Sequence, residues 1–100
     1  HTIDACAADQ FQQQVRLMCN LPPADTKLLS SCCMANILGD VWKEDGGEPE
    51  WLPLQSNPNV HLHLYGKKAA RKGRKMGHFT VLANDADNAF QTAQTLHQSL

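Results

Sequence analysis

Residues 60–65 read Val-His-Leu-His-Leu-Tyr, and this strict alternation of apolar and polar side chains predicts a half-buried β-strand. Residues 78–82 read His-Phe-Thr-Val-Leu, which alternate in the same way and predict a second strand. The connection between them, residues 66–77, begins and ends with glycine, which is typical of a loop. This segment limits the possible folds more closely than any other, because it requires a sheet.

The same connection, residues 66–77, is the most strongly charged part of the chain, and we call it the basic loop. It contains six of the nine Lys and Arg residues: Lys67, Lys68, Arg71, Lys72, Arg74 and Lys75. Like charges at this density repel one another unless an anion lies among them. The net charge of the chain is only −1, so the basic loop favours a local anion site over a nucleic-acid surface.

Two cations of the basic loop are placed to share one anion. Lys67 follows the end of the first strand, and Arg74 follows Gly73. A guanidinium group can bind a phosphate through two hydrogen bonds, and an ammonium group adds a mobile point charge. The alternative is a solvated surface hairpin without a ligand, and the composition of the loop does not decide between the two interpretations.

The first forty residues predict one helix and one strand. Asp9 and Gln12 have the spacing of a capping box, and the apolar residues that follow predict a helix over residues 9–19. The apolar and small residues of 28–38 predict a buried strand that ends before Gly39.

The later part of the chain completes a small α+β fold. Residues 40–59 are acidic and rich in Gly and Pro, which predicts a solvated loop with one short helical turn near residues 51–54. A final helix is predicted to begin at Asn84 or Asp85, with one apolar stripe: Ala86, Ala89, Phe90, Ala93, Leu96 and Leu100. The order of elements predicts a small antiparallel sheet with flanking helices, which we expect on one side of the sheet.

Three histidines raise the question of a metal site. His61 and His63 share one face of their strand, and His78 on the neighbouring strand could join them around zinc. No carboxylate or cysteine is obviously placed to complete the set, so the sequence favours neutral histidines in the core or in a groove, and no metal ligand is assigned.

The four cysteines do not form a recognisable framework. Cys6, Cys19, Cys32 and Cys33 contain no Cys-x-x-Cys pair, and adjacent residues on a strand point to opposite faces. We interpret them as reduced, small apolar residues of a cytoplasmic protein.

Several functions find no support in the sequence. There is no P-loop, dinucleotide fingerprint, nucleophile elbow or pair of catalytic carboxylates, and no apolar run of the length that spans a bilayer. The first residue is His1, and helical sequence follows almost at once, so we expect the chain to be a piece of a longer polypeptide.

An ordered series of motifs resembles a known family. The series comprises His1-Thr-Ile-Asp-Ala-Cys, Ser31-Cys-Cys-Met-Ala-Asn-Ile-Leu-Gly-Asp, Glu48-Pro-Glu-Trp, His61-Leu-His-Leu-Tyr-Gly-Lys and Gly73-Arg-Lys-Met-Gly-His. It resembles the C-terminal portion of 5-(carboxyamino)imidazole ribonucleotide synthase, an ATP-grasp enzyme of purine biosynthesis, over essentially the whole chain. One difference is Lys72, which stands where the family usually has proline and predicts a more mobile loop in the absence of ligand.

The resemblance implies a division of labour along the chain. Residues 1–27 would end the ATP-grasp domain, and residues 28–100 would form the C-terminal sheet domain. In the family, ATP phosphorylates bicarbonate, and the carboxyphosphate then carboxylates the amine of aminoimidazole ribonucleotide. By motif, Lys67 and Arg74 would bind the ribonucleotide phosphate.

The family implies the remaining expectations. Arg71 and Lys75 would be supporting cations, and no catalytic residue is expected in this chain, which should be inactive by itself. ATP and Mg²⁺ would be bound by the preceding domain, with bicarbonate as co-substrate. The expected partner is a small ribonucleotide, without nucleic acid or membrane, in a cytoplasmic homodimer.

Two alternatives remain open at this level. The related ATP-grasp phosphoribosylglycinamide formyltransferase ends with a similar basic loop, although His78 after Met76-Gly77 favours the carboxylating enzyme. A stand-alone anion- or nucleic-acid-binding module could also use the loop, but the loop lacks interleaved aromatic residues for base stacking.

Overall fold

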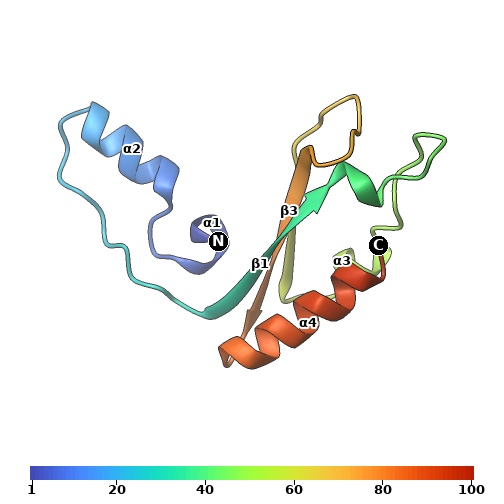
Figure 1. Ribbon diagram of the computed structural model, residues 1–100. Coiled ribbons are helices and arrows are strands. Elements are labelled where there is room, and N and C mark those ends of the chain that lie inside the picture. Colours follow the sequence, from blue (N-terminus) through green and yellow to red (C-terminus); the bar gives the residue numbers. More distant parts are fainter.

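A computed structural model describes residues 1–100 and contains a three-stranded antiparallel sheet with flanking helices (Figure 1). The elements are α1 (Thr2–Ala5), α2 (Gln10–Met18), β1 (Ser31–Leu38), a 3₁₀ turn η1 (Gly39–Val41), α3 (Leu52–Gln55), β2 (Val60–Leu64), β3 (Lys75–Ala83) and α4 (Ala86–Gln98). The spatial order of the strands is β1-β3-β2, so the strand that leaves the basic loop lies in the centre. The predicted α+β fold is confirmed.

The apolar core lies between the sheet and α4. Its buried members come from two strands and two helices: Ile37, Leu54, Phe79, Val81 and Ala93. Val60 and Leu62 of β2 pack against this cluster, as their alternation predicts. The short helix α3 brings Leu54 into the core, so the predicted helical turn in the loop 40–59 is also confirmed.

The capping residues that the sequence predicts are found at the starts of α2 and α4. Asp9 caps α2 by accepting hydrogen bonds from the backbone N–H groups of Phe11 and Gln12, and the side chain of Gln12 accepts from the backbone N–H of Asp9. Asp85 caps α4 by accepting from the backbone N–H of Asn88. The predicted helix 9–19 therefore differs from α2 only at its ends.

The helices do not all lie on one side of the sheet, so that expectation was wrong. Asp4 of α1 contacts His61 and His63, which point away from the core face of β2. The segment around α1 therefore covers part of the face opposite to α4. A carboxylate that can pair with imidazoles holds it there, and the helical pattern of α1 alone does not reveal this partner.

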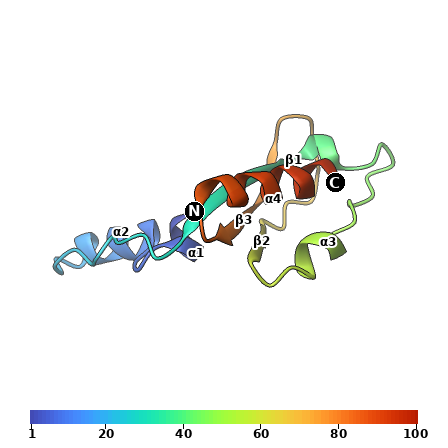
Figure 2. The ribbon, with the colours of Figure 1, turned by 90° about the horizontal axis from the view of Figure 1, so that it is seen from below.

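Helix α2 projects away from the sheet in both views (Figures 1 and 2). None of its residues is buried, and its apolar side chains Phe11, Val15 and Met18 are all more than half exposed. A helix with an uncovered apolar stripe gains little stability from packing within this chain. No helix here is long and apolar enough to cross a membrane.

Two strand boundaries differ from the prediction. β1 begins at Ser31 instead of residue 28, because Leu28 pairs with Cys6 next to α1 instead of with β3. β3 begins at Lys75 instead of residue 78, and Gly77 pairs with both Ile37 and Leu64. A Cβ at Gly77 would lie 2.5 Å from the carbonyl oxygen of His63, so this glycine permits close strand packing and does not end the loop.

Candidate functional site

The two predicted phosphate ligands, Lys67 and Arg74, bind carbonyl groups of the basic loop itself. Lys67 Nζ donates to the carbonyl oxygen of Lys75 at 2.6 Å, and Arg74 Nη1 donates to that of Ala69 at 2.8 Å. Lys67 is exposed and Arg74 is half-buried. An ammonium group has three N–H donors and a guanidinium group has five, so each side chain keeps donors for an anion.

The two supporting cations are arranged differently. Arg71 has an exposed side chain, and its carbonyl oxygen accepts from the backbone N–H of Arg74 at 2.9 Å. Lys75 is exposed at the first position of β3, and its carbonyl is the one that Lys67 binds. Backbone carbonyl groups of the basic loop thus link Lys67 with Lys75 and Arg71 with Arg74.

The basic loop is held by the turn that follows β1. Asp40 Oδ1 accepts from the backbone N–H of Gly73 at 2.7 Å, and the backbone N–H of Gly39 donates to the carbonyl of Arg74 at 2.8 Å. The sequence predicted that Asp40 belongs to a solvated acidic loop, and for this residue the prediction was wrong, because its carboxylate binds the basic loop. A carboxylate that accepts from the loop backbone also offsets some of its positive charge.

A second group of polar side chains lies beside the basic loop, on the sheet face that α1 covers. His63 Nε2 and Asp4 Oδ2 are 2.8 Å apart, and the rings of His63 and His78 stack at 4.7 Å with 20° between their planes. Tyr65 Oη and His78 Nδ1 are also 2.8 Å apart. We call Asp4, His63, His78 and Tyr65 the imidazole chain.

Three members of the imidazole chain, His63, His78 and Tyr65, border a groove of about 760 Å³ that is also lined by Lys75, Met34 and Asn36. The sequence placed His63 and His78 on neighbouring strands, and their pairing in the sheet confirms that placement. It did not find Asp4, which no local pattern connects to His63 because the two are 59 residues apart.

Asp4, His63 and His78 offer ligand atoms within 4.8 Å of one another. Metal binding needs nitrogen lone pairs that converge on one point. The two imidazole planes are stacked and nearly parallel, so their nitrogen lone pairs lie in separate planes, and one nitrogen of each ring already has a hydrogen-bond partner. This geometry favours a hydrogen-bonded chain, and we do not assign these residues as metal ligands.

Burial lowers the pKa of His78 from its ordinary value of 6.5, because the buried site disfavours the charged imidazolium, and the neighbouring His63 lowers it further. In the unfolded chain His78 takes up a proton near pH 6.5, whereas in the folded chain it does so only at lower pH. The stability that this group contributes is therefore complete above pH 6.5 and decreases as the pH falls towards the folded-state pKa.

We therefore expect the free energy of unfolding, measured by urea denaturation between pH 7.5 and pH 5, to decrease below about pH 6.5. The substitution His78→Gln should make that decrease smaller, because it removes the group whose protonation differs between the two states. The substitution His97→Gln, at an exposed position near the end of α4, is the matched control. An unchanged pH dependence in His78→Gln would contradict the assignment.

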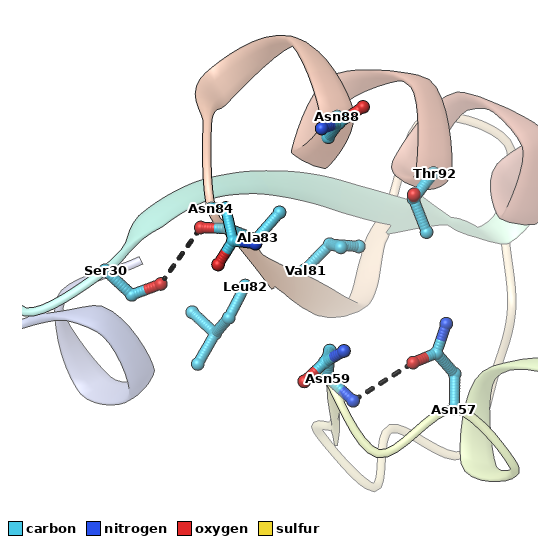
Figure 3. Close-up of a pocket in the computed structure, with 9 residues that line it drawn as sticks. All are labelled: Ser30, Asn57, Asn59, Val81, Leu82, Ala83, Asn84, Asn88 and Thr92. Carbon is cyan, nitrogen blue, oxygen red and sulfur yellow. Dashed lines mark hydrogen bonds between the residues drawn. The ribbon is translucent and has the colours of Figure 1, made fainter.

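A second cleft, of about 440 Å³, lies near the opposite end of the sheet (Figure 3). Amide and hydroxyl side chains line it, and no charged residue does: Ser30, Asn57, Asn59, Asn84, Asn88 and Thr92. Asn57 Oδ1 accepts from the backbone N–H of Asn59, and Ser30 donates to the carbonyl of Ala83, so these groups mainly stabilise turns. The basic loop and its groove form the better candidate site.

The fold and the site define a small α+β domain with a cationic hairpin loop beside a groove that is lined by both polar and apolar side chains. Residues 32–92 match the family described as the phosphoribosylaminoimidazole carboxylase C-terminal domain, and the chain belongs to this family. The resemblance found in the sequence motifs is thereby confirmed. The match to a carboxylase family does not favour the formyltransferase alternative.

Individual relatives agree with this family. The chain is 40% identical over 91 residues to N5-carboxyaminoimidazole ribonucleotide synthase from Bacillus subtilis, which covers 91% of this chain and 23% of that protein. The crystal structure of the corresponding synthetase from Thermotoga maritima matches with a TM-score of 0.85 at 38% identity, over 98% of this chain and 28% of that one.

A third relative was solved with ligands. The synthase from Aspergillus clavatus, in complex with ADP and 5-aminoimidazole ribonucleotide, matches with a TM-score of 0.78 at 34% identity, over 98% of this chain and 26% of that one. The present chain therefore spans about a quarter of the length of each of these relatives.

Proposed function

We propose that this chain acts as the C-terminal part of an ATP-dependent ligase that carboxylates 5-aminoimidazole ribonucleotide with bicarbonate. The carrying observation is the basic loop, which presents Lys67 and Arg74 on a turn that the protein itself holds in place. The names of the relatives and the ribonucleotide in the Aspergillus clavatus complex support the choice of substrate.

In this proposal the 5′-phosphate of the ribonucleotide lies against Lys67 and Arg74. The half-buried guanidinium group supplies a fixed pair of donors, and the exposed ammonium group supplies a charge that can follow the phosphate. Arg71 and Lys75 add positive potential around the same turn. Anchoring the substrate at its phosphate would leave the amine free to react in the space next to the groove.

The nucleotide and Mg²⁺ belong, in this proposal, to the part of the enzyme that precedes these residues. Mg²⁺–ATP sites use carboxylates together with backbone or lysine contacts to the phosphates. The one group of potential metal ligands in this chain, Asp4, His63 and His78, does not suit this purpose, because two of its members are stacked imidazoles.

Residues 1–27 are proposed to form the end of the ATP-grasp domain, and residues 28–100 the C-terminal sheet domain. The exposed apolar face of α2 supports this division, because it would be covered by the rest of the preceding domain. A homodimeric, cytoplasmic enzyme remains a prediction from the family.

The proposal is tested with a chimera in which this chain replaces the matching C-terminal part of the Bacillus subtilis synthase. We expect phosphate release from ATP that depends on both bicarbonate and 5-aminoimidazole ribonucleotide, together with formation of the carboxylated ribonucleotide. A folded chimera that binds ATP but shows no ribonucleotide-dependent turnover would contradict the proposed function.

The 100-residue chain alone is expected to release no phosphate above background from Mg²⁺–ATP, with bicarbonate and 5-aminoimidazole ribonucleotide present. The reason is that the sequence contains no phosphate-binding glycine loop, and its one cluster of potential metal ligands includes a single carboxylate, Asp4. A coupled phosphate assay measures this result, with the chimera as the positive control. Ribonucleotide-dependent turnover by the chain alone would show that the chemistry lies within these residues.

A further inference from the structure

A continuous series of side-chain contacts connects α1 with the basic loop. It begins at Asp4, passes through the stacked rings of His63 and His78, and reaches the hydroxyl group of Tyr65. The Tyr65 ring in turn lies 5.5 Å from Lys67 Nζ. We propose that the imidazole chain positions Lys67 for its contact with the ribonucleotide phosphate, so that its members are positioning residues. This inference rests on the proposed function.

The last contact of the series explains how the chain acts on Lys67. A lysine ammonium group near the face of a tyrosine ring is attracted by the ring quadrupole. Lys67 has only one hydrogen-bond partner, the carbonyl of Lys75, and a flexible side chain with one partner would otherwise move widely. The ring therefore gives the ammonium group a second fixed contact while its other donors stay free.

Tyr65 needs a partner of its own to provide that contact, because its side chain is 46% exposed. The hydrogen bond to His78 Nδ1 fixes the direction of the ring. His78 is itself only 8% exposed and is stacked on His63, and the carboxylate of Asp4 fixes the orientation of His63. The ring that supports Tyr65 directly, His78, is thus much more buried than Tyr65 itself.

The direction of the hydrogen bond between Tyr65 and His78 depends on the tautomer of His78. When the proton of a neutral His78 is on Nε2, Nδ1 accepts the Tyr65 O–H. Protonation would turn Nδ1 into a donor and force the hydroxyl group to reverse its role. The charged or titratable groups that face His78 are His63 on β2, Asp4 and the amino terminus on the α1 side, and Tyr65 next to the loop.

The experiment is a double-mutant cycle in the chimera between Tyr65→Phe and Lys67→Ala. Tyr65→Phe keeps the ring and removes only the hydroxyl group. By itself it should raise KM for the ribonucleotide roughly two- to five-fold, without changing kcat or KM for ATP. In the Lys67→Ala background the same substitution should have no further effect, because the group that it positions is absent. His78→Gln should behave like Tyr65→Phe.

His61→Gln is the matched control for these variants. His61 lies on the same strand and face as His63, 3.8 Å from Asp4, but it makes no contact with His78 or Tyr65 in the series. We expect its KM values to equal those of the parent chimera. A rise in KM as large as that of His78→Gln would show that any disturbance of this face has the same result, and would overturn the proposal.

Other outcomes separate this inference from the proposed function. If Tyr65→Phe is silent, or if its effect in the Lys67→Ala background is undiminished, the positioning role is wrong while the phosphate site stands. If Lys67→Ala itself leaves KM unchanged, the phosphate assignment is wrong. In that case NMR relaxation of the Lys67 Cε in the 100-residue chain tests the positioning role. Faster motion of Cε in Tyr65→Phe than in the parent chain supports the contact between Lys67 and Tyr65. Unchanged motion overturns it.

Discussion

Alanine at Lys67 or Arg74 is expected to lower kcat/KM for 5-aminoimidazole ribonucleotide by roughly ten- to hundred-fold in the chimera, which corresponds to the loss of one charge-assisted contact of about 1.5–3 kcal/mol. The loss should appear mainly in KM, because the phosphate is distant from the reacting amine and its binding is nearly the same in the ground state and the transition state. KM for ATP should hardly change. Steady-state kinetics with each substrate varied in turn measure both effects.

Two further variants make this result specific. Lys68→Ala removes an exposed cation of the same loop that has no assigned contact, and it should be nearly silent. Arg74→Lys keeps the charge but not the planar pair of donors, so it should recover only part of the activity. Because Arg74 also holds the carbonyl of Ala69, the thermal stability of each variant must be compared with that of the parent. Unchanged ribonucleotide KM in Lys67→Ala and Arg74→Ala would refute the phosphate site.

Gly39→Ala is expected to destabilise the domain by about 1–3 kcal/mol, because the added methyl group would overpack a closely packed backbone contact. A Cβ at Gly39 would overlap the backbone carbonyl of Arg71, and Gly39 also donates to the carbonyl of Arg74. Neither neighbour is a flexible side chain, so the basic loop itself would have to move. The free energy of unfolding, obtained by urea denaturation, measures the cost.

The same substitution should weaken ribonucleotide binding in the chimera, because the displaced loop carries Lys67 and Arg74. Gly47→Ala is the matched control: its Cβ would lie 2.9 Å from the side chain of Asp45, which can move aside. It should therefore leave ribonucleotide binding unchanged and cost little stability. If Gly39→Ala were as stable as the parent, the close contact between η1 and the basic loop would be incorrect.

The sequence predicts those parts of the fold that depend on neighbouring residues. The alternation in residues 60–65, the capping box at Asp9 and the cap at Asp85 each report a local preference, and the structure contains all three elements. The prediction that Gly77 ends the loop was wrong, because the sequence alone does not distinguish a glycine that ends a loop from one that allows close strand packing.

The candidate site was predictable only in part, for a related reason. The charge of the basic loop is visible in a few consecutive residues, and so Lys67 and Arg74 could be proposed directly. Asp4 and Asp40 could not, because their partners lie far away along the chain and depend on how the sheet is folded. An isolated aspartate in a short helix or turn carries no sign of the group that it will bind.

The position of the basic loop within the β2–β3 hairpin also affects how the domain assembles. These two strands are close in sequence, whereas β1 must close a much longer loop to reach β3, so the hairpin is the pairing with the smaller entropic cost. If the hairpin forms early, the cations of the basic loop are brought close together before Asp40 of η1 can bind the loop and offset part of their charge. We therefore expect the first step of sheet folding to be sensitive to ionic strength, and we expect multivalent anions in the surrounding solution to speed the assembly of the hairpin that later serves as the candidate binding site.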